Sequence, residues 1–229
     1  MKQKRIFYTE WAYVFGLIFL GLGTALMEKA NLGMSMIVSP AYVLYLRISQ
    51  NLSFFTFGMA EYVFQALLLI LLTLIMKKFK WSYLFSFVTA VIYGNILDLI
   101  MTLVSVIEVS GMVSRIISFA VGMIFCALGV AFMFLTYISA EAYEQFVKEI
   151  SEKIQVPISK TKTVYDCISC GVGILLSFIF FGMGHFEGVK VGTIICALVN
   201  GFLIGQCSKG LEYIFAFKDR LALKSFFEK

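Results

Sequence analysis

Long apolar runs separated by short polar segments are the dominant pattern along this chain of 229 residues. An apolar run of about 20 residues can cross the hydrocarbon core of a bilayer as a helix. The runs lie at about residues 8–27, 57–76, 82–106, 113–137, 163–183 and 189–213. They predict an all-α membrane protein with six transmembrane helices, and little chain is left for a water-soluble domain.

Two connections between these runs are long enough to hold a further short helix. The connection at residues 34–48 is nearly uncharged and contains Ser39-Pro40, which suits the N-cap and the first position of a helix. The connection at residues 139–156 has apolar residues at helical spacing and charged residues opposite them. That pattern is typical of an amphipathic helix at a membrane surface, with Ser139 as its expected N-cap.

The two halves of the chain resemble each other. Residues 16–27 (GLIFLGLGTALM) align with residues 122–133 (GMIFCALGVAFM), and later segments align at a similar offset. Each half then contains three spans and one short helix. Because three is an odd number, the second half must enter the membrane from the opposite side, as in many secondary transporters. We therefore expect two inverted repeats, residues 1–110 and 111–229.

Positive charge gathers on one side of the predicted membrane. With the N-terminus inside, 15 of the 19 lysines and arginines fall in cytoplasmic segments. The positive-inside rule therefore predicts that both termini, including a tail after residue 213, lie in the cytoplasm. The formal charge of +5 is thus a signal of topology, and we expect no nucleic-acid partner.

Polar residues recur at helical spacing within three of the spans. A carboxylate at transmembrane depth is expensive, so it normally faces a partner or a wet cavity. The three polar stripes predict one interior surface, although hydrogen bonding between packed helices is the alternative. For Asp166, an ion pair with Lys162 is a further alternative. The predicted substrate-contacting residues are Ser35, Asn95, Asp98, Asp166, Thr193 and Asn200.

Other sequence features favour packing over chemistry. Gly201-x-x-x-Gly205 predicts a close approach between two helices. Glu61 and Gln65 are one turn apart in the second run, where an interfacial position would explain the glutamate. We find no nucleophile, phosphate-loop or metal-ligand motif. The sequence therefore predicts neither an enzyme nor a bound cofactor or metal.

Four segments in order carry a family resemblance: residues 30–35 (ANLGMS), 40–44 (PAYVL), 94–99 (GNILDL) and 188–194 (GVKVGTI). Together they resemble the YczE/YyaS/YitT-like group of bacterial membrane proteins over nearly the whole chain. The resemblance implies a multi-pass inner-membrane protein and supplies no settled substrate. The group often has a Pro-Gly-Asp-like element after the fourth span, where this chain has residues 139–142 (SAEA). An acidic role at that place would pass to Glu141 or Glu144, or be absent.

Three hypotheses for function follow. The first is a transporter of a small solute bound between the two repeats, with an anion preferred because helix N-termini attract negative charge. The second is the substrate-binding subunit of a multi-component uptake system, with Ala12-x-x-x-Gly16 as a docking surface. The third is a non-transporting regulator or assembly factor. The lipid bilayer is a partner in every case, and a second copy of the chain is a further expected partner.

The charge asymmetry makes the topology testable. A cysteine introduced at position 187 should react with a membrane-impermeant thiol reagent from outside intact cells. A cysteine at position 150 should react only after the membrane is permeabilised. The reverse labelling would refute both the orientation and the inverted repeat.

Overall fold

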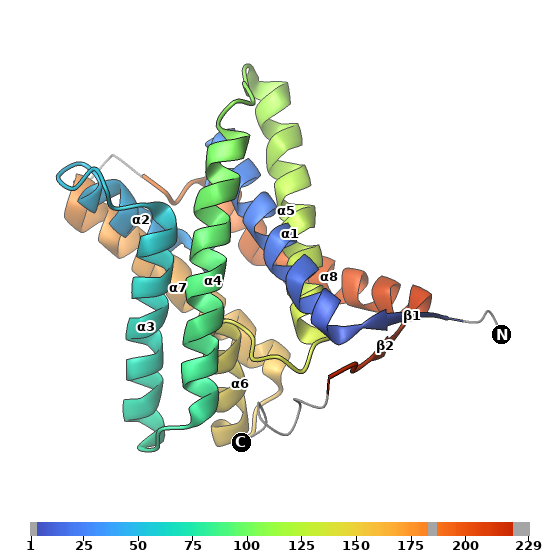
Figure 1. Cartoon of the computed structure of the whole chain (residues 1–229). Coiled ribbons are helices and arrows are strands. Elements are labelled where there is room, and N and C mark those ends of the chain that lie inside the picture. Colours follow the sequence, from blue (N-terminus) through green and yellow to red (C-terminus); the bar gives the residue numbers. More distant parts are fainter. Residues whose placement is uncertain (1–3, 183–186, 222–229) are drawn as a thin grey trace.

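The computed structural model describes residues 4–182 and 187–221. In chain order these form β1 (Arg5–Tyr8), α1 (Thr9–Ala30), α2 (Ser39–Ile48), α3 (Phe57–Met76), α4 (Trp81–Val104), α5 (Met112–Phe134), α6 (Ala142–Ile154), α7 (Ile158–Phe181), α8 (Val191–Ile214) and β2 (Phe215–Lys218). Figure 1 shows the long helices crossing one another, with the short helices α2 and α6 towards opposite ends of the molecule.

Six of these helices, α1, α3, α4, α5, α7 and α8, are long and apolar enough to cross a membrane. They coincide with the six predicted spans, and α2 and α6 coincide with the two predicted short helices. The protein is therefore a multi-pass membrane protein. Two parts of the sequence prediction, the end of the fifth span at residue 183 and residues 222–229 of the tail, lie outside the described residues.

The helices α1 and α5 run antiparallel in very close contact, because glycines remove side chains from the crossing. The backbone of Gly16 lies against Gly129, and that of Gly23 lies against Gly122. A Cβ atom added at Gly23 would lie only 2.5 Å from Cys126 Sγ and 2.6 Å from the Gly122 carbonyl oxygen. These four glycines therefore bring the two backbones within van der Waals contact, which is how small residues favour helix association in lipid.

The remaining helices pack around this central pair. The helix α4 packs on α1 and α8 packs on α5, while α3 pairs with α4 and α7 pairs with α8. The short helix α2 lies against α3 and α7, and α6 lies against α3, α4 and α7. The large apolar side chains left exposed on the long helices, such as Leu74, Leu99 and Leu198, form the surface that lipid would cover.

Both predicted helix caps are wrong, the first by one residue and the second by two. The N-cap of α2 is Val38, and Ser39 is already the first helical residue, with Pro40 behind it. The N-cap of α6 is Glu141 rather than Ser139, whose carbonyl oxygen instead accepts a hydrogen bond from Thr89 Oγ1 (2.9 Å). Tertiary contacts made by these two segments decide where each helix begins.

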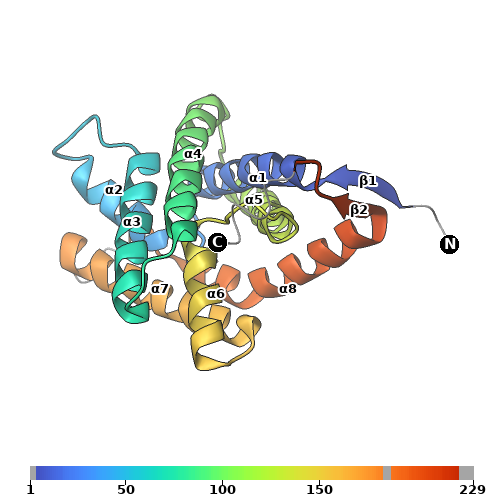
Figure 2. The same ribbon diagram turned by 60° about the horizontal axis from the view of Figure 1, so that its bottom comes forward.

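A pair of strands that no sequence pattern predicted joins the two ends of the described chain. The strands β1 and β2 are four residues each and run parallel, as Figure 2 shows at the outer end of α8. Glu10, in the first turn of α1, reinforces the pair by accepting hydrogen bonds from the backbone N–H groups of Arg220 and Leu221. Such short segments carry no periodicity that could reveal a strand.

The predicted close approach at Gly201 and Gly205 is not found within the described part of the chain. A Cβ atom added at either position would meet no atom within 4 Å. The glycines that bring helices together lie instead on α1 and α5, and at the crossing of α3 and α4, where Gly58 meets Gly94.

The difference between these two kinds of glycine gives a matched test. We expect Gly23→Ala to destabilise the protein by about 1–3 kcal/mol, the usual cost of overpacking, because the new methyl group meets backbone atoms that cannot move aside. Gly201→Ala should be neutral or stabilising by up to about 1 kcal/mol, since alanine favours a helix interior. Thermal unfolding midpoints in detergent would measure both, and equal losses would contradict the packing described.

Candidate functional site

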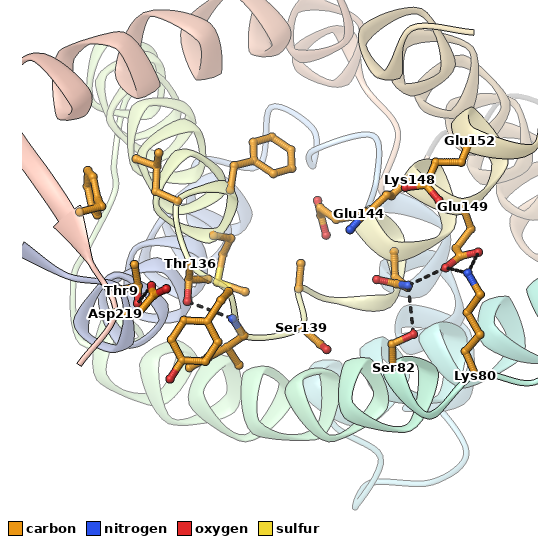
Figure 3. Close-up of a pocket in the computed structure, with 18 residues that line it drawn as sticks. Thr9, Lys80, Ser82, Thr136, Ser139, Glu144, Lys148, Glu149, Glu152 and Asp219 are labelled. Carbon is orange, nitrogen blue, oxygen red and sulfur yellow. Dashed lines mark hydrogen bonds and ion pairs between the residues drawn. The ribbon is translucent and has the colours of Figure 1, made fainter. Parts of the chain in front are cut away.

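A cavity of about 930 Å³ lies at the α6 end of the molecule. Figure 3 shows Thr9 and Asp219 on one side of it, at the start of α1 and after β2, and α6 with the start of α4 on the opposite side. Residues 133–140, which end α5 and lead into α6, form a further wall. Its lining therefore comes from both halves of the chain.

The charged side chains of this cavity have both signs, with carboxylates in excess. Among the described residues, Glu144, Glu149, Glu152 and Asp219 line it together with two lysines, Lys80 and Lys148. Lys80 is already paired, because its Nζ lies 2.7 Å from both carboxylate oxygens of Glu149.

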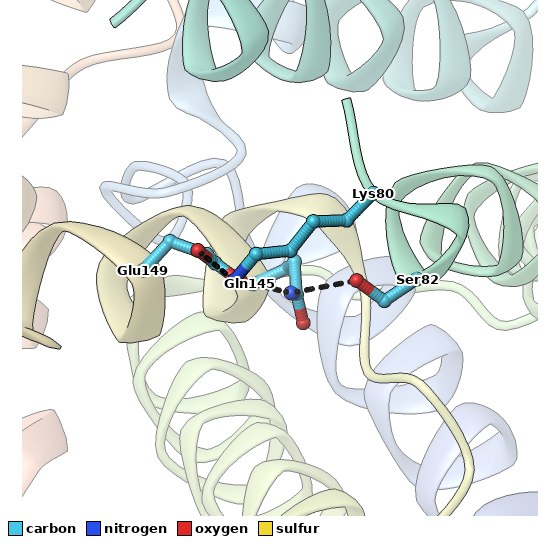
Figure 4. Close-up of polar contacts among 4 residues, drawn as sticks. All are labelled: Lys80, Ser82, Gln145 and Glu149. Atoms are coloured by element: carbon cyan, nitrogen blue, oxygen red, sulfur yellow. Dashed lines mark hydrogen bonds and ion pairs between the residues drawn. The ribbon is translucent and has the colours of Figure 1, made fainter. Parts of the chain in front are cut away.

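The ion pair between Lys80 and Glu149 also connects α6 to the chain before α4 at the rim of the cavity. Figure 4 shows Gln145 between Glu149 and Ser82, with its Nε2 donating to Glu149 Oε1 at 3.2 Å and to Ser82 Oγ at 3.4 Å. Glu149 is buried, whereas Lys80 is partly exposed. These contacts hold α6 against the turn between α3 and α4.

Beneath the cavity, Gln65 of α3 organises a buried acidic cluster. Its Oε1 accepts the backbone N–H of Ala142 at 3.0 Å, which fixes the orientation of the amide. Its Nε2 then donates to Glu141 Oε2 at 3.1 Å and to Glu61 Oε2 at 3.4 Å. Tyr143 donates its hydroxyl proton to the same Glu61 oxygen at 2.9 Å. Glu61 and Gln65 are completely buried, and Glu141 is 5% exposed.

Lys162 of α7 joins this cluster to the cavity. Its Nζ lies 3.8 Å from Glu144 Oε1 and 3.8 Å from Asp166 Oδ1, so it sits between two carboxylates and is too far for a strong hydrogen bond to either. Glu144 also lines the cavity. The acids therefore continue from the cavity wall into the space between α3, α6 and α7.

Burial perturbs the acids on and before α6. It raises the pKa of Glu141 well above the ordinary value, and the negative charges of Glu144 and Glu61 raise it further. Burial also raises the pKa of Glu144, against the opposing effect of Lys162. Within the described residues, one oxygen of Glu61 and one of Glu141 are buried without a hydrogen-bond partner. A buried acid with a raised pKa and an oxygen that lacks a hydrogen bond is a candidate for a functional site.

Four of the six residues predicted to contact substrate are buried. Asp166 belongs to the acidic cluster through Lys162. Thr193 begins α8, where its Oγ1 accepts the backbone N–H of Lys190 at 3.3 Å, and Ser35 precedes α2. Asn200 is buried on α8, with its Oδ1 unpaired within the described part of the chain. None of the four lines the large cavity.

The other two, Asp98 and Asn95, lie apart from the cluster. Asp98 anchors the start of α3, because its carboxylate accepts hydrogen bonds from the Gly58 N–H at 2.8 Å and from Thr56 Oγ1 at 2.6 Å. Asn95 is exposed and donates to the Val91 carbonyl oxygen of its own helix. The polar residues Asn95 and Asp98 of α4 therefore do not form part of one interior surface with the other predicted residues. Their role in solute binding stays a prediction.

The structure adds residues that were not among those predicted. Glu61 and Gln65 had one signal in the sequence, an acid and an amide one turn apart inside an apolar run, but an interfacial position explained it equally well. In the sequence, Tyr143 is one of the residues on the apolar face of the predicted amphipathic helix at 139–156, and no pattern marks it as a site residue. Both acids named in place of the family's acidic element, Glu141 and Glu144, belong to the cluster.

Comparisons with known proteins find relatives whose function is not known. A family model described as "Family of unknown function (DUF6198)" matches residues 7–209. The "Uncharacterized protein YyaS" of Bacillus subtilis (strain 168) is 24% identical over 209 residues, which is 91% of this chain and 96% of that protein. No solved structure matches the chain.

The position of Asp98 leads to a stability prediction. Asp98→Asn removes the charge at the α3 N-terminus and one of two acceptor oxygens, so we expect it to destabilise the protein by about 1–2 kcal/mol. Asn95→Leu, on the exposed side of the same helix, should change stability by less than about 0.5 kcal/mol. Unfolding in detergent measures both. Unchanged stability in Asp98→Asn with altered solute affinity would instead place Asp98 on the solute path.

Proposed function

The chain belongs to the family of unknown function DUF6198, and we propose that it is a transporter whose small solute binds between two inverted three-helix repeats. The observation that carries this proposal is a polar cavity open at the α6 end above a buried acidic cluster, in a molecule closed at the α2 end. The argument has three parts: symmetry, closure and the chemistry of the lining.

The contacts between α1 and α5 support a two-fold relation between the halves. In the sequence repeat, Gly16 corresponds to Gly122 and Gly23 corresponds to Gly129. In space, Gly16 meets Gly129 and Gly23 meets Gly122, so exchanging the halves exchanges one contact for the other. A two-fold axis between two copies gives this self-complementary pattern. It supports inverted repeats with boundaries near residues 1–110 and 111–229.

The other helix contacts follow the same exchange. The pair α1–α4 corresponds to α5–α8, and α3–α4 corresponds to α7–α8. The pair α2–α3 corresponds to α6–α7, and α2–α7 corresponds to α6–α3. All eight of these contacts are present. Inverted repeats allow two states, each open to one side, to form when the halves exchange conformations.

Within the described residues, one end of the molecule has a large cavity and the other does not, as expected for a transporter in a state that is open to one side only. At the α2 end, Arg115 Nε donates to the Ala30 carbonyl oxygen at 2.6 Å, and the Met34 N–H donates to the Gly188 carbonyl oxygen at 3.2 Å. A cavity of only about 20 Å³ lies there, against about 930 Å³ at the α6 end. We infer a state open at the α6 end.

The charge distribution supports a cytoplasmic position for that end. Lys77, Lys78 and Lys80 lie in the turn between α3 and α4, which contacts α6, and the two terminal strands lie at the same end. By the positive-inside rule this end faces the cytoplasm, which places both termini there. The state is then inward-open in the inner membrane of a bacterium.

The lining favours a solute with a positively charged group over the anion that we expected. The first backbone N–H of α6 already donates to Gln65, and Glu141 lies beside it. The first N–H group of α6 is therefore already taken, and the carboxyl group of Glu141 disfavours an anion beside it. Acidic side chains in the cavity wall suit an amine or an amino acid.

The two other hypotheses have less support. Ala12 and Gly16, expected to form a docking surface for a partner, are buried within the molecule, and Gly16 packs against Met133 and Gly129 of α5. The substrate-binding subunit hypothesis therefore lacks its specific feature. A regulatory role and association of two copies stay predictions.

A cross-link at the closed end tests the proposal. Lys190 Nζ donates to Asn31 Oδ1 across the α2 end, so a short bifunctional thiol reagent should join Asn31→Cys to Lys190→Cys in a background without other cysteines. A panel of amines and amino acids is first screened by thermal shift on purified protein. The stabilising solutes are then tested for uptake into proteoliposomes.

We expect the cross-link to abolish uptake while leaving the thermal shift intact, since the cavity at the α6 end stays open. Each single cysteine treated with the same reagent is the matched control. Undiminished uptake by the cross-linked protein would reject alternating access. A panel in which no solute binds or crosses would reject the transporter.

A further inference from the structure

We propose that Glu61 and Glu141 share one exchangeable proton, delivered from the cavity through Glu144, and that this proton is the coupling ion. The coupling rests on the proposed transport function, whereas proton binding stands without it. The shared side chain of Gln65, the cavity wall at Glu144 and the burial of Glu61 and Glu141 carry the inference.

The two carboxyl groups are held in complementary positions by one amide. Gln65 Nε2 donates to Oε2 of Glu61 and to Oε2 of Glu141, while its own oxygen is occupied by the Ala142 N–H. Because that oxygen is fixed, the amide cannot turn to accept a proton from either acid. In each glutamate the Oε1 atom is buried and unpaired within the described residues. Each acid therefore has one oxygen anchored and one free to hold a proton.

Charge balance argues that these two acids are not both ionised. Four carboxyl groups, those of Glu61, Glu141, Glu144 and Asp166, lie near one ammonium group, that of Lys162. Lys162 pairs with Glu144 and Asp166. In the described part of the chain neither Glu61 nor Glu141 forms an ion pair. Two like charges in one low-dielectric site raise each other's proton affinity, so one of the pair keeps its proton.

Other titratable groups face the pair from every side but do not alter this balance. They are Tyr143 of α6, Tyr165 of α7, Tyr93 of α4, Tyr13 of α1 and Cys126 of α5. Tyrosines and buried thiols are neutral near pH 7. Burial raises the pKa of Glu141, which agrees with a proton held at neutral pH.

A proton fits this site better than a metal ion does. Calcium needs about 6–8 oxygen ligands and magnesium about six in near-ideal geometry. No group of three or more acidic, histidine or cysteine side chains in the described part of the chain could hold a metal ion. A proton needs only one of the two free oxygens.

The path of the proton conserves charge at each step. A hydronium ion in the cavity protonates the Glu144 carboxylate and leaves water. Glu144 then passes the proton to the Glu61–Glu141 pair and becomes a carboxylate again beside Lys162. Exchange of the two halves would expose the pair to the other side, where water accepts the proton.

Dicyclohexylcarbodiimide, which modifies protonated carboxyl groups in apolar surroundings, tests the proton site on the full chain in detergent. Labelling of Glu61 and Glu141 is followed by peptide mass spectrometry from about pH 5 to about pH 9, where buried carboxyl groups titrate. We expect labelling to fall as the pH rises, with a midpoint well above the value of about 4.3 for a free glutamate.

Two variants test whether Glu61 and Glu141 influence each other's protonation. Glu141→Gln keeps the hydrogen bond to Gln65 in its carbonyl oxygen and removes a negative charge. It should therefore lower the labelling midpoint of Glu61 by about one pH unit or more. Glu108→Gln, an exposed glutamate in the loop between α4 and α5, is the matched control and should leave that midpoint unchanged. The wild-type titration needs no variant to fold.

Stability gives a second readout with a defined sign. A carboxyl group whose pKa is raised on folding stabilises the native state most below its unfolded pKa, and that stabilisation is lost as the pH rises through the folded pKa. The thermal midpoint should therefore fall with rising pH over this window, and Glu141→Gln should flatten the decline.

Several outcomes would overturn the inference. A labelling midpoint at the ordinary glutamate value, or no dependence on pH, rejects the proton site. Protection by Na⁺ at fixed pH replaces the proton with a metal cation and likewise rejects it. Solute uptake that a proton gradient fails to drive rejects the coupling alone. Absence of any uptake with the titration intact rejects the proposed transporter and leaves the proton site standing.

Discussion

The close contact between the backbones of α1 and α5 positions the rest of the molecule. In a bilayer, apolar side chains gain little by leaving lipid for one another, so helices associate where their surfaces approach closely. Gly16, Gly23, Gly122 and Gly129 allow that approach at two levels of one crossing. The pairs α1–α4 and α5–α8 extend from it, and the short helices complete each side. The cavity is the space left between these groups of helices at one end.

The acidic cluster is the main exception to the apolar interior. Charges at membrane depth destabilise a fold unless they are paired, hydrated or neutralised. Gln65 offsets part of this cost by donating to two glutamates from one nitrogen, and Tyr143 contributes a second donor to Glu61. Within the described residues, one oxygen of each acid has no hydrogen-bond partner. The proton proposed above would occupy one of these two oxygens.

Asp98 shows why an acid in a span does not by itself identify a binding site. Its carboxylate occupies the start of α3, where free N–H groups and the helix dipole favour a negative charge. Glu61 has a similar setting in the sequence, an acid in an apolar run, but it meets another acid and an amide. The difference lies in the neighbouring helix, which the local sequence does not reveal.

The sequence by itself determined the class of protein, its six spans and its two short helices. The length of an apolar run and its helical periodicity are local properties, and they decide whether a segment partitions into lipid or stays in water. Through the family resemblance it also named Glu141 and Glu144 as candidates for an acidic role, without deciding whether either has one. The tertiary structure decided which polar residues meet, because Glu61 and Gln65 of α3 are distant in the chain from Tyr143 of α6 and Lys162 of α7. It also decided which glycines bring helices together, since a glycine looks the same in sequence whether its helix faces lipid or another backbone.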